Sequence, residues 1–253
     1  MITNPVSGAW YLIRGFSLLN KPGIRAYVII PLLINISFFS AVIAVGMRYF
    51  DTFLDQLMPV LPDWLTWLSG IFWILFLIAA LLIAFYTFSL IANIFSAPFN
   101  GLLAEAVEEY LTGRKPELAG GWKKAFTDLV PSMLAEFKKT LYFAAWALLF
   151  ALFFIIPVVQ IIAPFIWMLY TAWALALEYL DYPMANHGYK FPDNKNKMSK
   201  RLLQSLGFGL STSVATLIPI ANFLVMPASV AGATALWVEK FQPALTSDSV
   251  QEN

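Results

Sequence analysis

Four long uncharged stretches divide the chain, and the first has the length of one membrane crossing. Residues 26–47 are 22 consecutive uncharged positions, bounded by Arg25 and Arg48. As a helix this stretch would be about 33 Å long, and the hydrocarbon core of a bilayer is about 30 Å thick. Pro31 lies in its first turns, where a helix tolerates proline best. The pattern predicts one membrane-spanning helix.

The second stretch, residues 64–104, is too long for one crossing and carries no turn signal for two. Neither Gly nor Pro occurs within residues 71–97. We therefore expect one long helix over residues 64–96 that extends beyond the membrane. The residues expected to break it are Pro98, Asn100 and Gly101.

A short amphipathic helix should follow this break. Its apolar side chains recur at helical spacing, while Glu105, Glu108 and Glu109 lie largely on the other face. Gly113 is the expected C-cap, since glycine adopts the left-handed conformation that commonly ends a helix.

The third and fourth stretches, residues 140–177 and 202–238, repeat one pattern. Each has a proline pair near its middle, which predicts a unit of helix, proline-bounded turn and helix. The prolines are Pro157 with Pro164, and Pro219 with Pro227. The returning arms, residues 165–177 and 228–238, have only 13 and 11 residues. Because they are too short for a core of about 30 Å, we favour re-entrant hairpins over two pairs of short tilted spans.

The charged residues between these stretches indicate a topology. The segment before the first span carries three basic residues, and the segments 105–139 and 178–201 carry six and five. The loop 49–63 has three aspartates and no Lys or Arg. Two spans followed by two hairpins place all basic segments on one side, which the positive-inside rule makes cytoplasmic. Acidic residues are interleaved, so either insertion sense stays open.

Composition agrees with a membrane protein. Apolar residues make up 60% of the 253 residues and charged residues 12%, against about 25% charged in soluble domains. We therefore expect an all-α integral membrane protein, with residues 1–253 as a single membrane domain. The net charge of +1 gives no sign of a nucleic-acid partner, and the absence of Cys excludes disulfides and thiolate metal sites.

No pattern typical of an enzyme occurs in the sequence. The chain has one histidine, so it lacks a His cluster for metal, and it has neither a phosphate-binding P-loop nor a nucleophile elbow. We predict no catalytic residues, no metal and no cofactor. His187 is expected to be a solvated loop residue, and the polar segment 186–200 a solvated loop whose lysines face anionic lipid headgroups.

A candidate anion site precedes the first span. Pro22 and Gly23 are expected to start the helix, which would leave several backbone N–H groups unpaired at its positive end. Arg25 offers a fork of donors suited to oxyanions, and Lys21 adds a point charge. On these residues alone, the plainer interpretation is favoured: the two cations anchor the span at the headgroups.

Polar residues also follow the long helix. Asn93, Phe99, Asn100 and Glu105 form a tentative pore lining, although amides at membrane depth equally suit helix–helix hydrogen bonding. Glu105 should be a partner for a basic residue rather than a ligand, because a carboxylate repels an anion.

Several motifs, in order along nearly the whole chain, resemble the CysZ sulfate permease family of bacterial inner membranes. They are Lys21-Pro22-Gly23-Ile24-Arg25, Ile30-Pro31-Leu32-Leu33-Ile34-Asn35, Pro62-Asp63-Trp64-Leu65, Ala97-Pro98-Phe99-Asn100-Gly101, Tyr179-Leu180-Asp181-Tyr182-Pro183 and Gly232-Ala233-Thr234-Ala235-Leu236-Trp237. One position departs: relatives commonly carry a second basic residue where this chain has Ala26.

The resemblance implies a multi-pass inner-membrane protein that carries sulfate into the cytoplasm for cysteine synthesis without ATP hydrolysis. It implies long transmembrane helices with partially penetrating hairpins, contact with membrane lipids, and a homo-oligomer. It places sulfate at Gly23, Ile24 and Arg25, with Lys21 sharing the charge, and so reverses the preference stated above. The alternative function is a non-transporting membrane scaffold or assembly factor.

Overall fold

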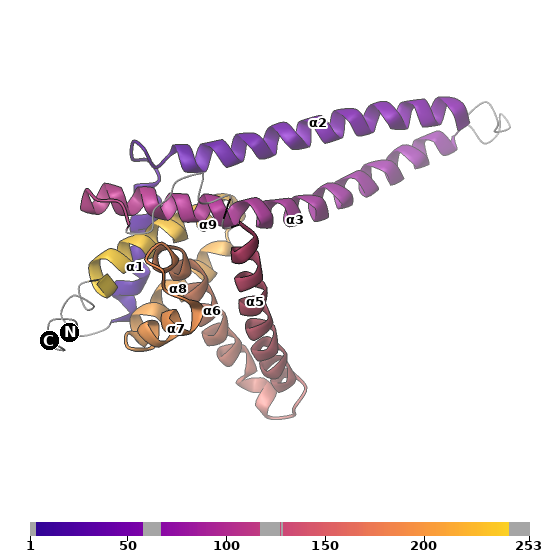
Figure 1. Cartoon of the computed structure of the whole chain (residues 1–253). Coiled ribbons are helices and arrows are strands. Elements are labelled where there is room, and N and C mark those ends of the chain that lie inside the picture. Colours follow the sequence, from indigo (N-terminus) through magenta and orange to yellow (C-terminus); the bar gives the residue numbers. More distant parts are fainter. Residues whose placement is uncertain (1–3, 58–66, 117–126, 128, 243–253) are drawn as a thin grey trace, which may run out of the picture. The chain divides into compact units, whose positions relative to one another are not determined.

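The computed structural model describes residues 4–57, 67–116, 127 and 129–242, and every regular element among them is a helix. The α-helices are α1 (Pro5–Leu18), α2 (Ala26–Leu57), α3 (Leu68–Thr112), α5 (Leu129–Ala151), α6 (Ala163–Ala185), α7 (Phe191–Ser199), α8 (Leu202–Thr216) and α9 (Pro219–Leu236) (Figure 1). Short 3-10 turns cover Leu152–Phe154 and Val159–Ile161, and a π-helical turn covers Trp237–Phe241. The prediction of an all-helical protein is confirmed for these residues.

The chain separates into two units. The arm unit is Ile29–Ala97, and the core unit combines the described residues of Met1–Val28 and Pro98–Asn253. Among the residues that the structure describes, two helical stretches are long and apolar enough to cross a membrane: Ala26–Thr52 in α2, and Phe137–Phe154, which covers the second half of α5 and the 3-10 turn after it. The first agrees with the predicted span at residues 26–47.

In the arm unit, α2 and α3 form an antiparallel pair (Figure 1). Phe50 of α2 stacks on Phe76 of α3, with ring centroids 3.9 Å apart, and meets Trp73 edge-on at 4.7 Å. No described residue of Ala26–Thr52 is buried, and Leu33 and Val45 are more than half exposed. Apolar side chains displayed along a whole helix are stable in lipid, where burial by protein is not needed.

The predicted break after the long helix is wrong. Helix α3 continues through Pro98, Asn100 and Gly101 to Thr112. A proline inside a helix removes one N–H donor and displaces one carbonyl group. Helices in membrane proteins tolerate this, because neighbouring groups form hydrogen bonds with the freed backbone groups and the remaining helical hydrogen bonds are kept. The predicted C-cap is confirmed: Gly113 has φ +71°, and its N–H donates to the Glu109 carbonyl at 2.8 Å.

In the core unit, glycines bring helices into backbone contact. A Cβ added to Gly8 of α1 would lie 2.0 Å from the carbonyl oxygen of Gln204 in α8, and one added to Gly15 would lie 1.9 Å from that of Ala228 in α9. At Gly209 of α8 the same atom would lie 1.7 Å from a carbonyl oxygen of α6. Small residues at helix crossings are the usual way for membrane helices to associate.

The two proline-containing stretches do form helix–turn–helix units, α5 with α6 and α8 with α9. The returning arms are longer than predicted, however: α6 has 23 residues and α9 has 18, or about 35 and 27 Å. Pro164 begins α6, Pro219 begins α9, and Pro227 lies inside α9. The predicted short arms are wrong: α6 continues through Glu178 and Asp181, which pair with Lys139, and α9 begins at Pro219 and continues through Pro227. Arm length therefore no longer separates re-entrant hairpins from tilted spans.

The polar segment 186–200 is not a simple loop. It contains α7, whose Phe191 packs edge-on against Tyr142 and Phe143 of α5, with ring centroids 5.2 and 5.9 Å apart. An aromatic residue at the start of the segment gives this polar helix an apolar surface to dock on.

Candidate functional site

The segment Lys21–Arg25 forms a turn between α1 and α2. Ile24 is 1% exposed, and its side chain belongs to the hydrophobic interior of the core unit. Lys21, Gly23 and Arg25 are exposed. Gly23 has φ +87°, a conformation that costs a residue with a Cβ about 1–2 kcal/mol. The buried Ile24 therefore holds the turn in place while its neighbours face outward.

The backbone donors of this turn are more occupied than the sequence predicted. The N–H groups of Ile24 and Arg25 both donate to the Lys21 carbonyl, at 3.1 and 3.2 Å. Those of Tyr27 and Val28 also donate to carbonyls of the turn, at 3.0 and 3.1 Å. Within the described residues, only the N–H groups of Gly23 and Ala26 remain without a hydrogen bond here. The helix begins at Ala26 rather than at Pro22 and Gly23, and this shift explains the difference.

Two uncompensated cations accompany these two free donors. Neither Lys21 nor Arg25 forms an ion pair with any described residue. An oxyanion prefers such a combination: a planar guanidinium, an ammonium and backbone N–H groups near a helix start. Gly23 leaves the backbone of the turn open to a ligand, because no other atom lies within 4 Å of the position that a Cβ would take.

The residues of the tentative pore lining fall in different units. Asn93 lies on α3 in the arm unit, and the structure does not describe its side chain. Phe99, Asn100 and Glu105 lie on the part of α3 that belongs to the core unit. Asn100 is 6% exposed, and Asn186 at the end of α6 donates to the neighbouring Gly101 carbonyl at 3.1 Å.

His187 is not solvated, and that prediction is wrong. Its Nε2 lies 2.8 Å from Oε1 of Glu108, its side chain is only 12% exposed, and its ring lies 5.4 Å from that of Trp237. Glu108 itself is buried, at 3%. The sequence did hold a signal, since Glu108 follows the apolar Ala104 by four residues and therefore shares its face of the helix, which is buried.

A second buried ion cluster escaped the sequence analysis. Lys139 of α5, with 3% of its side chain exposed, lies 3.0 Å from both the Glu178 and Asp181 carboxylates of α6. Asn194 of α7 donates to Asp181 as well. The cluster joins three helices, and its one cation already faces two carboxylates, so we assign it to the fold rather than to anion binding.

A third polar contact joins the two ends of the core unit. Arg14 pairs with Glu239, and the Tyr11 hydroxyl donates to the same carboxylate at 2.9 Å. Burial, together with this bond to Glu239, raises the pKa of Tyr11 above its ordinary value. Tyr11 therefore stays a neutral donor and holds α1 against the π-helical turn.

Comparison of the sequence with known proteins shows which family this chain belongs to. Residues 11–227 match the family described as "Sulfate transporter CysZ/Etoposide-induced protein 2.4". The chain is 40% identical over 235 residues to "Sulfate transporter CysZ" of Pseudomonas aeruginosa strain LESB58, which covers 93% of this chain and 96% of that protein. The protein of the same name from Pseudomonas paraeruginosa strain DSM 24068 / PA7 has the same identity and coverage. This chain therefore belongs to the sulfate transporter CysZ/etoposide-induced protein 2.4 family.

Proposed function

We propose that this chain is a sulfate channel or permease of a bacterial inner membrane, working without ATP hydrolysis and supplying sulfate for cysteine synthesis. Relatives that match 93% of the chain are named sulfate transporters, not enzymes. The observation that carries the proposal is the exposed turn with unpaired Lys21 and Arg25, set directly before an apolar helix long enough to span a membrane.

Sulfate binding would use each part of the turn differently. Arg25 donates two parallel hydrogen bonds to the dianion, Lys21 adds charge, and the free N–H groups of Gly23 and Ala26 contact the remaining oxygens. Ile24 contributes by its burial, which fixes the turn, and not by direct contact of its side chain. From this entrance the ion would pass along polar groups of α3, where Asn93, Phe99, Asn100 and Glu105 are the proposed lining.

Residues 1–253 form, in this proposal, one multi-pass membrane domain with two re-entrant hairpins. In the turn of the first hairpin, Ile155 is 76% exposed and Val158 is 78% exposed. In the turn of the second, Leu217 is 78% exposed. A hairpin that crossed completely would put these side chains into water, whereas one that stops part way keeps them in lipid.

The same turns favour a homo-oligomer. Neither turn continues the α-helix, and in the first turn Val158, between two short 3-10 turns, has φ +71°. Irregular backbone at membrane depth needs protein or water around it. A second copy of the chain would supply the protein, and a cavity enclosed by several copies would supply the water.

The test is sulfate binding to the purified protein and uptake of labelled sulfate into proteoliposomes, with Arg25→Ala. A hydrogen bond to a charged group contributes about 1.5–3 kcal/mol, so its loss should weaken sulfate binding about ten- to hundredfold and lower uptake. Arg114→Ala removes an exposed arginine beside another positive-φ glycine and serves as the matched control. If Arg25→Ala binds and transports as well as the wild type, the site assignment is wrong.

A further inference from the structure

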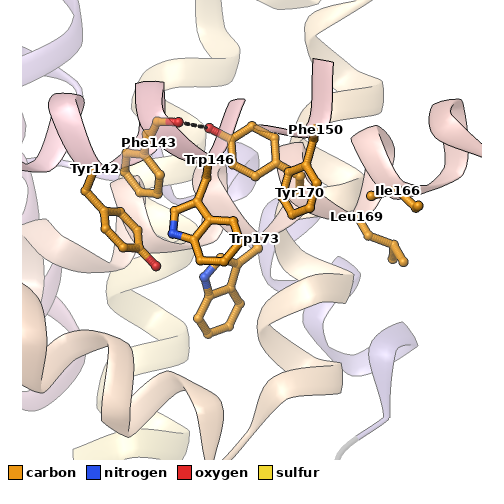
Figure 2. A pocket seen from close by; sticks show the side chains of 8 residues that line it. All are labelled: Tyr142, Phe143, Trp146, Phe150, Ile166, Leu169, Tyr170 and Trp173. Carbon is orange, nitrogen blue, oxygen red and sulfur yellow. Dashed lines mark hydrogen bonds between the residues drawn. The ribbon is translucent and has the colours of Figure 1, made fainter. Parts of the chain in front are cut away.

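An open aromatic groove lies between α5 and α6 of the first hairpin. Its volume is about 340 Å³, and Figure 2 shows rings from both helices turned toward it. The residues that line it are Tyr142, Phe143, Trp146, Phe150, Ile166, Leu169, Tyr170 and Trp173. The hydroxyl of Tyr170 donates to the Phe143 carbonyl at 2.7 Å, which ties the two walls together (Figure 2). The walls are otherwise almost entirely apolar.

One end of this groove is cationic. Residues at four-residue intervals share one face of a helix, so Lys138 lies one turn before Tyr142 on the ridge that continues through Trp146 and Phe150. Lys195 of α7 lies over the Tyr142 ring, with Nζ 5.3 Å from its centroid. Neither lysine forms an ion pair with a described residue. The groove therefore has two lysines without an ion pair at one end and aromatic walls leading toward the hairpin turn.

This polarity matches one kind of molecule, with an anion at its head and a long apolar tail. Lys138 lies at the start of Phe137–Phe154, the stretch of the hairpin that is long and apolar enough to span a membrane, and Lys195 lies over Tyr142 near that start. Lysines at the end of such a stretch lie at headgroup depth, where anionic lipids attract them. A soluble anion would use the lysines but leave the aromatic walls bare, whereas a partner helix would leave the charges unmatched.

We infer that the groove binds one anionic phospholipid, with its phosphate at Lys138 and Lys195 and an acyl chain along the aromatic walls. Trp146 is 41% exposed and Leu169 50% exposed, so both offer apolar surface for the chain to cover. The bound lipid links α5 and α7 through its headgroup. This inference rests on the membrane placement proposed above and is independent of the sulfate site.

The experiment uses the full-length protein in detergent, with phosphatidylglycerol, phosphatidylcholine and inorganic phosphate as separate additions. Bound lipid is counted by native mass spectrometry, and thermal unfolding is followed in parallel. A lysine near anionic lipid contributes roughly a fivefold gain in affinity, so Lys138→Ala with Lys195→Ala should weaken phosphatidylglycerol binding about 25-fold. The matched control replaces Lys190 and Lys200, two exposed lysines that flank α7. It should change binding less than about twofold, because Lys195 rather than either of these lies over a ring of the groove.

The position of the acyl chain is measured by quenching of tryptophan fluorescence. Phosphatidylglycerol with brominated chains should quench the wild-type fluorescence, and Trp146→Phe should remove part of that quenching. The inference is overturned if the wild type shows no preference for phosphatidylglycerol, if the double lysine variant keeps that preference, or if inorganic phosphate alone reproduces the thermal shift. A dimer that forms through the groove and excludes the lipid would also overturn it. Sulfate binding should stay at the wild-type level in the double variant, so failure of either proposal is recognised separately.

Discussion

Gly23→Ala tests the anion site through its backbone conformation alone. Gly23 has φ +87°, and no atom lies within 4 Å of the position that an added Cβ would take. The substitution therefore creates no collision, and its cost is that of holding an L-residue in the left-handed region, about 1–2 kcal/mol. For a chain of this size, a loss of 1 kcal/mol lowers the melting temperature by about 2–4 °C. We expect a fall of about 2–8 °C on this basis.

The effect on sulfate should be larger than this loss of stability suggests. Relaxation of residue 23 toward negative φ would turn its N–H and shift Arg25, which follows it by two residues. Losing one hydrogen bond to a charged ligand costs about 1.5–3 kcal/mol, so sulfate should bind about ten- to hundredfold more weakly. Labelled sulfate binding and thermal unfolding of the same detergent-purified sample measure the two quantities.

Gly113→Ala is the matched control for this experiment. Gly113 also has positive φ, at +71°, it is exposed, and its Cβ position is equally empty. It should lose similar stability and keep wild-type sulfate binding. Gly23→Asn should fall between Gly23→Ala and the wild type, because Asn tolerates the left-handed region better than Ala. Wild-type binding in Gly23→Ala, or an equal loss in Gly113→Ala, would refute the claim that this turn holds the anion.

Two further pairs of substitutions test the packing of the core unit by thermal unfolding. Gly209→Ala puts a Cβ 1.7 Å from a carbonyl oxygen of α6, so the two helices must separate, at a cost of about 3 kcal/mol or more. Gly101→Ala meets no atom within 4 Å and should gain up to about 1 kcal/mol of stability from helix propensity. Equal melting temperatures of the two variants would contradict the close approach at Gly209. Lys139→Met leaves two partly wet carboxylates facing each other and should cost about 2–3 kcal/mol, and adding Asp181→Asn should recover part of it. A wild-type melting temperature in Lys139→Met would show that the cluster contributes nothing.

The local pattern of the sequence was enough for several features. The uncharged stretch at residues 26–47 predicted a spanning helix because length and apolarity alone decide whether a helix suits a bilayer. The repeated proline pairs predicted two helix–turn–helix units, and Gly113 predicted a helix end, since both signals act within a few residues. The residues of the proposed anion site could also be named from the sequence, because Lys21, Gly23 and Arg25 are neighbours in the chain.

Only the tertiary structure decided how charged residues are used. Lys139 and Asp181 are 42 positions apart, and Glu108 and His187 are 79 positions apart, yet each pair is in contact. Because the sequence does not show these partners, the charges of Glu178 and Asp181 predicted that the returning helix ends before them, and His187 was predicted to be exposed to solvent. A charged group leaves water only when a distant partner compensates it. The apolar stretches therefore identified the helices, while the pairing of their few charges determined where α6 ends and which polar groups are buried.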